Sequence, residues 1–419
     1  MQTQSGKYFL LLGILLFCLP FFPKGSVICI LLLVVLWATT GGFRNSLDAW
    51  NKDRNLFLFS LFYLAHVAGL LYTSDFSFAA ADLQTKLSFL IFPVILPAAC
   101  LATYQYRKLN DVFILGCIVA CVLCYLISLK AYLSSHQVDE FYYASFSRFF
   151  HPSYFSFYLN LAILFVVEKM YREWQALSLV KQIAHALLIY FFFAVIFQLS
   201  ARTAIATAML SVFVYLVLNS DRSASRWKQA GRILFFLASL LLLQKLILQK
   251  HNRFEQVGEV LNHPDTTSKN PVGIADEGNS TSSHFLVWSN AVRLISEHPI
   301  LGVGTGDVKN ELIRTYRENN FETGVKSKYN AHNQFLNSAA ALGLLGLISL
   351  GLIFFIGVKI SVKKKDWLYF SFLLIFFLNS LTESVLEIQA GVLFFAVFNM
   401  LFYLRNSEPD TNSELPTPN

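Results

Sequence analysis

Runs of apolar residues recur along almost the whole of this 419-residue chain. A membrane-spanning helix needs about 20 mostly apolar residues, because the hydrocarbon core of a bilayer is about 30 Å thick. Charged residues make up only 14% of the chain, whereas soluble domains carry about 25%. The runs fall at about 8–22, 26–42, 55–72, 87–103, 111–132, 153–169, 182–199, 203–219, 233–249, 333–358, 367–382 and 389–404. The sequence therefore predicts an all-α fold, a polytopic transmembrane helix bundle of about 12 spans.

Basic residues are concentrated in alternate loops of this predicted bundle. They are Arg44, Lys52, Arg54, Arg107, Lys108, Lys169, Arg172, Lys181, Arg222, Arg226, Lys228, Arg232, Lys359, Lys363, Lys364 and Lys365. Loops rich in Lys and Arg stay in the cytoplasm, so this pattern predicts that both termini are cytoplasmic. The net charge of +7 is then a topology signal and does not indicate nucleic-acid binding.

The longest polar stretch, residues 250–331, belongs to the opposite, exterior face. Two helices are expected within it. One runs from about His284 to Glu297 after a cap at Ser282 or Ser283, and the other from Val308 to Glu318 after a cap at Asp307. The predicted organisation is spans 1–9 over residues 1–249, a partly helical exterior segment over 250–331, spans 10–12 over 332–405, and a disordered cytoplasmic tail over 406–419.

A polar cluster at residues 329–337 stands at the mouth of an apolar helix and contains His332. One interpretation is a solvated polar tip at the membrane boundary, since an imidazole is tolerated there without any catalytic purpose. The other is a titratable group held at the membrane surface for chemistry. Further along, Gly343 and Gly346 share a face on which a neighbouring helix could approach closely.

The order His332-Asn333, nine residues, then Gly343-x-x-Gly346 closely resembles the signature of the bacterial O-antigen ligase family. These polytopic membrane enzymes move glycans off undecaprenyl diphosphate. The turn at 299–304, Pro-x-x-Gly-x-Gly, is also typical of the family shortly before its His motif, although a simple tight turn between helices is the favoured interpretation. The segment at 200–202, Ser-Ala-Arg, is similar to a second family segment.

Four positions depart from the family pattern. Leu347 stands where Gly, Thr or Tyr is usual, and Ala201 and Thr203 replace the more usual Ser and Gly. His284 stands four residues before Trp288, in a region where the family tends to place an Arg. This last difference leaves the identity of a second phosphate-binding residue open.

The resemblance implies that His332 is a general base that activates the acceptor hydroxyl. Arg202, between two apolar runs, is either an arginine that snorkels to the interface or a clamp for the diphosphate, whose oxygens suit the planar guanidinium. His284 and Arg293 are the candidates for a second diphosphate contact. Direct displacement inverts the anomeric configuration. With no Asp-rich motif on the exterior face, neither a metal nor another cofactor is expected.

Five further residues are weaker candidates for substrate contacts: Asn333, Arg148, His151, Arg314 and Arg317. His151 followed by Pro152 is adequately explained as a helix start at an interface, and the arginines as parts of solvated helix faces. The carboxylates of Glu383 and Glu387 are expected to be hydrated or paired with an Arg.

The expected partners are an undecaprenyl-diphosphate-linked glycan, an acceptor that is lipid A-core or a growing glycan, and membrane lipid. The expected location is the bacterial inner membrane, with the site on the periplasmic face, and the expected process is lipopolysaccharide assembly.

Two other enzyme functions remain open, a surface-polysaccharide (O-antigen) polymerase and a protein O-oligosaccharyltransferase. A transporter of lipid-linked glycan is the alternative that is not an enzyme. It predicts charges lining a path in mid-span, whereas the polar clusters here gather at one face.

Overall fold

The computed structural model describes residues 2–220 and 280–407, with side chains for 5–201, 203–220 and 283–407, and every regular element in these ranges is a helix. Several expectations lie outside these residues. They are the predicted span at 233–249, the basic residues between 222 and 232, the first part of the exterior segment, and almost all of the predicted tail.

Each of the other predicted apolar runs falls largely on a helix. The helices are α1 (Gln2–Cys18), α2 (Pro23–Thr39), α3 (Gly42–Lys52), α4 (Asn55–Ala68), η1 (Gly69–Tyr72), α5 (Phe76–Lys86), α6 (Ser88–Ile95), η2 (Leu96–Ala99), α7 (Thr103–Ser135), η3 (Val138–Phe141), α8 (Tyr143–Phe146), α9 (Pro152–Glu173), α10 (Leu179–Gln198), α11 (Arg202–Leu218), α14 (Ser280–Glu297), α15 (Val308–Glu318), α16 (Glu322–Ser327), α17 (Gln334–Lys364), α18 (Trp367–Ser380), η6 (Val385–Glu387) and α19 (Gln389–Ser407).

Within the described residues, six helical segments are long and apolar enough to cross a membrane: 55–72, 76–99, 103–135, 179–198, 334–364 and 389–407. The number is seven if α2 and α3, which meet at 90°, form one bent span. The apolar parts of α1, α11 and α18 are shorter, and the 14 residues of α18 rise only about 21 Å. Over residues 2–220 and 280–407 the fold is thus all-helical with six candidate spans, and the expected number of 12 is not confirmed.

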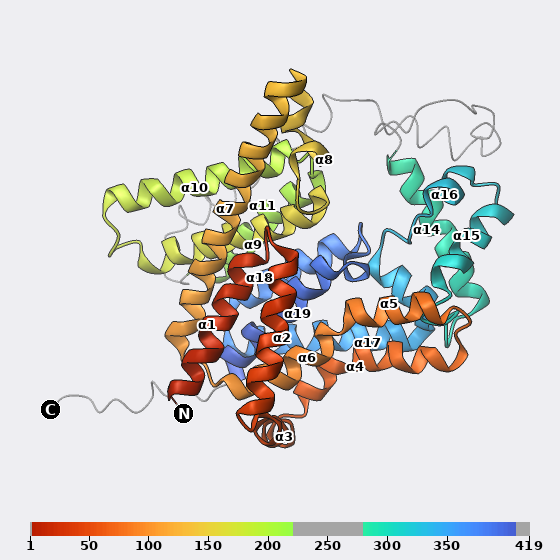
Figure 1. Ribbon diagram of the computed structural model, residues 1–419, viewed down its shortest axis with the longest axis horizontal. Helices are drawn as coiled ribbons and strands as arrows, with labels where there is room; N and C mark the ends of the chain where they lie inside the picture. The colour runs from red at the N-terminus through yellow and green to blue at the C-terminus, as the bar shows by residue number, and fades with distance from the viewer. Residues whose placement is uncertain (1, 221–279, 408–419) are drawn as a thin grey trace.

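Helices α14, α15 and α16 lie together beside α4, α5 and α17, on the opposite side of the molecule from α10 (Figure 1). Their apolar side chains do not form a separate core. Val287 and Leu294 of α14 and Tyr316 of α15 belong to one buried cluster with Ala65 of α4 and Leu342 of α17. Helices α14 and α15 are therefore supported by α4 and α17.

Helices are found at both predicted places, Ser280–Glu297 and Val308–Glu318, but the predicted caps are wrong: Ser282 and Ser283 lie inside α14, and Asp307 acts differently from a cap. Its carboxylate forms no hydrogen bond within α15. Instead it accepts hydrogen bonds from the backbone N–H of Ser74 at 2.6 Å and of Asp75 at 2.8 Å, just before α5. Asp307 thereby fixes the start of the exterior helix α15 to the start of α5.

Helix α17 is broken at Gly343, which has φ 57° and ψ −139°. The break frees backbone groups that pair with the 299–304 turn: the N–H of Val303 donates to Ala340 O at 3.0 Å, and that of Gly304 to Ala341 O at 2.9 Å. A Cβ atom on Gly343 would lie 2.4 Å from the carbonyl of Ile300. The close partner of Gly343 is therefore this turn, not the neighbouring helix that the sequence led us to expect.

Candidate functional site

His332 lies immediately before α17 and adopts an unusual backbone conformation, with φ +43°. Two hydrogen bonds hold this backbone. Its N–H donates to Asn330 Oδ1 at 3.0 Å, and its carbonyl accepts from Trp288 Nε1 at 3.3 Å. A left-handed backbone is costly for a residue with a side chain, and such residues cluster at functional sites.

Asn333 explains structurally why an amide follows the histidine. Its Oδ1 atom accepts hydrogen bonds from the N–H groups of Phe335 and Leu336, so it is the N-cap of α17. Its Nδ2 atom donates to the carbonyl of Leu381 at 3.1 Å. Asn333 thus starts the helix and attaches that start to the α18–α19 connection.

Glu383, in the same connection, faces the imidazole of His332. Its Oε2 atom is 3.6 Å from His332 Nδ1, and its Oε1 atom accepts a hydrogen bond from Ser153 Oγ at 3.2 Å. Burial favours the neutral acid, but the adjacent imidazole of His332, aided by His151 and His284, outweighs burial and lowers the pKa of Glu383. A carboxylate in this position can orient the imidazole and stabilise its protonated form.

His284 is the second imidazole of the site. Its ring centroid is 4.9 Å from that of His332, and its Nδ1 atom is buried without a hydrogen-bond partner. Burial and the charge of His332 lower the pKa of His284. Of the two residues expected to bind the diphosphate beside Arg202, His284 is thus the one that the fold brings next to His332.

A buried ionic cluster beneath the site was not anticipated from the sequence. The ammonium of Lys86 is fully buried and pairs with the carboxylates of Asp82 and Glu387, the latter at 3.0 Å. Glu387 Oε1 accepts a hydrogen bond from Gln334 Nε2 at 3.1 Å, and Gln334 Oε1 accepts one from Leu386 N at 2.7 Å. The cluster therefore fixes the first residue of α17 to the connection that carries Glu383.

Both glutamates of that connection are thus placed differently from expectation. Glu383 pairs with His332 and Glu387 with Lys86, whereas solvent or an Arg was expected for each. The available signal in the sequence was the spacing of Asp82 and Lys86, which puts a carboxylate and an ammonium on adjacent turns at the edge of an apolar run.

A polar cavity of about 290 Å³ adjoins this cluster, between α5, α15 and the segment that leads into α17. Its polar lining residues are Asp82, Thr85, Lys309, Lys328, Asn330, Asn337 and Glu387. Asp82 Oδ2 is buried without a hydrogen-bond partner. The cavity therefore offers both donors and acceptors close to the segment that contains His332.

Arg202 begins α11, and its side chain lies outside the part that the structure describes. Its position follows from the backbone of α11. Asn160 of α9 donates to the carbonyl of Ala204 at 3.0 Å, and Ser153, about 10 Å earlier along α9, contacts Glu383. The N-terminal ends of α9 and α11 and the His332 segment therefore share one region of the molecule.

The remaining candidates lie at different distances from His332. His151 is exposed at the start of α9 and acts electrostatically on Glu383, whereas Arg148 is paired with Glu140 at 2.6 Å. Arg293 and Arg314 join an exposed ion-pair cluster between α14 and α15. Arg317 is exposed on α15. Among the described contacts, none joins these three exterior arginines to His332.

Comparison with known families finds a match for part of this region. Residues 186–351 match the family model described as O-antigen ligase. The matched segment contains Arg202, His284, His332 and Gly343 but ends before Glu383. No curated protein matches the chain. Over this segment, the chain is similar to the O-antigen ligase family.

Proposed function

We propose that this protein is an O-antigen ligase that transfers a glycan from undecaprenyl diphosphate to a hydroxyl group of lipid A-core. The observation that carries the proposal is the contact between His332 and Glu383 at the head of α17, within a chain that is similar to this family. A base oriented by a carboxylate is the arrangement that activation of a hydroxyl group requires.

The proposed reaction is a single displacement. The acceptor oxygen attacks the anomeric carbon, the bond from that carbon to the phosphate oxygen breaks, and the electron pair leaves with undecaprenyl diphosphate. The proton of the hydroxyl passes to His332 Nε2, while Nδ1 faces Glu383. A base of this kind contributes about 10²- to 10⁴-fold to a rate. The separation of 3.6 Å is compatible with this role, since catalytic hydrogen bonds are often long before substrate binds.

Arg202 is proposed to neutralise the departing diphosphate, because a guanidinium matches phosphate oxygens with two parallel hydrogen bonds. The environment of His284 favours its neutral form, so we assign it a hydrogen bond to the substrate in place of a second charge. Arg293, Arg314 and Arg317 remain candidates only for contacts at the rim. No metal or cofactor takes part in this proposal.

The proposed location is the inner membrane, with His332 on the periplasmic side. Support comes from the basic loops. Arg107 of α7, Arg172 of α9 and Lys365 after α17 line the same cavity, so residues that the positive-inside rule assigns to the cytoplasm converge in space. His332 lies at the opposite end of α17 from Lys364, the last residue of that helix.

The test is transfer in proteoliposomes that contain lipid-linked O-antigen and lipid A-core. His332→Ala is expected to lower the transfer rate by about 10²- to 10⁴-fold and to leave donor binding intact. His185→Ala, a partly exposed position on α10, is the matched control and should transfer normally. Full transfer by His332→Ala would refute the base assignment.

The glycan profile of a deletion strain separates the alternatives. A ligase leaves complete lipid-linked polymer that is not attached to the core. Loss of a polymerase leaves single repeat units on the core, and loss of an O-oligosaccharyltransferase leaves proteins without glycan. A transporter is favoured if purified protein moves lipid-linked glycan across vesicles without any transfer to an acceptor.

A further inference from the structure

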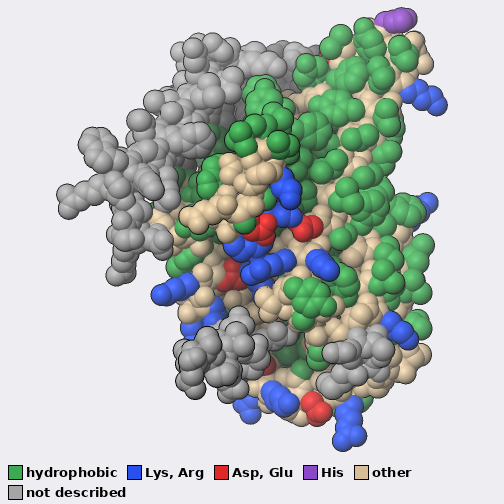
Figure 2. All heavy atoms as spheres, turned by 90° about the vertical axis from the view of Figure 1, so that its left-hand side faces the viewer, with side chains coloured by type: hydrophobic (Ala, Val, Ile, Leu, Met, Phe, Trp, Pro, Cys, Tyr) green, Lys and Arg blue, Asp and Glu red, His purple; other side chains and the backbone are tan. Residues whose placement is uncertain are grey.

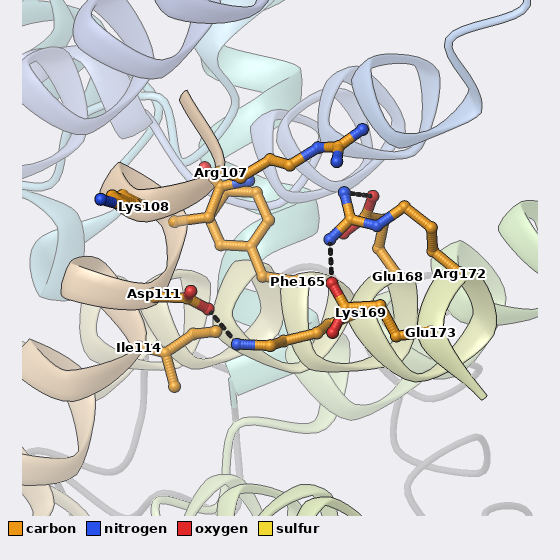
Figure 3. A pocket seen from close by; sticks show the side chains of 10 residues that line it. Arg107, Lys108, Asp111, Ile114, Phe165, Glu168, Lys169, Arg172 and Glu173 are labelled. Atoms are coloured by element: carbon orange, nitrogen blue, oxygen red, sulfur yellow. Dashed lines mark hydrogen bonds and ion pairs between the residues drawn. The ribbon is translucent and has the colours of Figure 1, made fainter. Parts of the chain in front are cut away.

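A second polar region lies far from His332, where the start of α7 meets the end of α9. Two adjoining cavities of about 170 and 280 Å³ share Arg107, Glu168 and Arg172 in their walls. The larger cavity extends to Lys365 and Arg405, beside the start of α18 and the end of α19. Figure 3 shows the smaller cavity, with side chains from α7 and α9 facing each other across it.

The acids in these walls are already paired with cations. Asp111 pairs with Lys169 at 2.8 Å, and Glu168 and Glu173 both pair with Arg172. In the larger cavity, Asp366 pairs with Arg405. The acids therefore leave little negative charge available to bind any other cation.

Two cations in the walls of the larger cavity remain available. Neither the guanidinium of Arg107 nor the ammonium of Lys365 forms a hydrogen bond or ion pair with another described side chain, and both residues are exposed. In Figure 3, Arg107 extends over the cavity with no interaction drawn to an acid. A guanidinium and an ammonium that face one cavity without an acidic partner form a site for an anion, and phosphate oxygens suit the guanidinium especially well.

The surroundings of the cavities are those of the lipid boundary. Along α7, Lys108 and Asp111 continue into a stripe of exposed apolar side chains on the same face: Leu115, Val122, Leu126, Leu129 and Leu133. From Leu115 to Leu133 the helix rises about 27 Å, close to the thickness of the hydrocarbon core. Tyr104 and Trp174, each more than half exposed near the cavities, are typical of the membrane interface.

Figure 2 shows the same combination on the face that it displays, where charged side chains gather beside a long band of hydrophobic ones. A ligand that carries both a phosphate and long apolar chains fits such a surface. A soluble phosphate ion would make no use of the stripe on α7.

We propose that these cavities bind the phosphate headgroup of an anionic phospholipid, such as phosphatidylglycerol, from the leaflet at this end of the helices. The headgroup pairs with Arg107 and Lys365, and the acyl chains lie along the exposed stripe of α7. The site is independent of the glycan transfer proposed above, since it uses none of the same residues.

The test is thermal unfolding of the full-length protein in a zwitterionic detergent, titrated with phosphatidylglycerol. The wild type is expected to gain a saturable rise in unfolding temperature. The double variant Arg107→Gln/Lys365→Gln should bind about 25-fold more weakly, at about fivefold for each cation removed. Retention of the wild-type titration by this variant would overturn the proposal.

The matched control is Lys181→Gln/Lys363→Gln, which removes the same charge from exposed positions outside both cavities. It should titrate as the wild type does, and an equal loss would mean that only the overall charge matters. Phosphatidylcholine and inorganic phosphate should each give no comparable shift. If inorganic phosphate reproduced the effect at millimolar concentration, the ligand would be a soluble anion and the lipid assignment would be wrong. Equal unfolding temperatures of all variants without lipid establish that each is folded.

Discussion

At the scale of single residues, the site depends on a histidine held in a strained backbone conformation. A residue with a side chain at φ +43° costs about 1–3 kcal/mol, and it persists only when its neighbours enforce it. Asn330 and Trp288 form hydrogen bonds with its backbone. The next residue, Asn333, is held in place by its own hydrogen bond to Leu381. The strain keeps the imidazole between Glu383 and His284.

Replacement of the carboxylate beside His332 tests its orienting role. Glu383→Gln keeps the size of the side chain but removes the charge that stabilises a protonated imidazole, so transfer should fall by at least about tenfold. Donor binding should be unchanged. Kinetics of transfer in proteoliposomes measure both, and a variant with the full rate would exclude Glu383 from the reaction.

The same residue predicts a pH dependence of stability. Because the pKa of Glu383 is lowered on folding from an ordinary value of 4.5, its contribution is present above about pH 4.5 and is lost as the pH falls through the lower, folded value. Wild type should therefore unfold at a higher temperature than Glu383→Gln near pH 6, and this advantage should shrink below pH 4.5. A difference that grows toward acid would contradict the assigned sign.

Asn333 has two roles that substitution can separate. Asn333→Asp keeps the acceptor that caps α17 but loses the donor to Leu381, whereas Asn333→Ala loses both. Loss of an N-cap costs about 0.5–2 kcal/mol, so the Ala variant should be less stable by about that amount than the Asp variant. Thermal unfolding at neutral pH measures the difference, and equal stabilities would show that the cap is unimportant.

The pairing of His332 with Glu383 could not be read from the sequence. The motif at 329–333 pointed to His332, and the position of this residue at the start of an apolar run predicted that it lies at the membrane boundary. Its partner Glu383, however, follows two further helices in the sequence. No local sequence pattern distinguishes a glutamate that contacts an imidazole from one that is solvated. Lys86 was missed for a similar reason, because the predicted span began one residue after it.

At the scale of elements, the break in α17 joins the exterior segment to the bundle. The 299–304 turn donates hydrogen bonds to Ala340 and Ala341 and accepts them from Leu344, so the turn occupies the gap that Gly343 opens. The helices on both sides were predictable from apolar periodicity. The break at Gly343 could not be predicted, because the apolar pattern continues through it unchanged. The turn that pairs with it, at 299–304, also lies well before α17 in the sequence.

Two glycines of α17 provide a matched pair of tests for this break. Gly343→Ala would put a Cβ atom 2.4 Å from the Ile300 carbonyl at a positive φ, so it should destabilise the protein and detach the turn. Gly351→Ala, with no atom within 4 Å of its Cβ position, should stabilise the helix by about 0.5–1 kcal/mol. Thermal unfolding compares the two, and a neutral Gly343→Ala would argue against the structural role of the turn.

At the scale of the whole molecule, the cluster around Lys86 connects α5, the start of α17 and the α18–α19 connection. These segments are far apart in the sequence, and each contributes different residues to the cluster. The carboxylates depend on Lys86, since burying a charge without its partner is strongly unfavourable.

Lys86→Met is therefore expected to destabilise the protein by about 3–5 kcal/mol, because two carboxylates remain buried without their cation. The neutral triple variant Lys86→Met/Asp82→Asn/Glu387→Gln should recover most of that loss. Unfolding in detergent measures both variants. If the triple variant were as unstable as Lys86→Met, packing and not charge would be the cause.

The position of Glu383 beyond the matched segment has a consequence for exchanging parts between relatives. A chimera of this chain that received residues 186–351 from a protein of the O-antigen ligase family would take its histidine from the donor and keep Glu383 of this chain. Such a hybrid would be active only if the histidine and the glutamate had compatible positions and orientations. Moving the short stretch around 381–389 together with the larger segment should rescue hybrids that the larger segment alone leaves inactive.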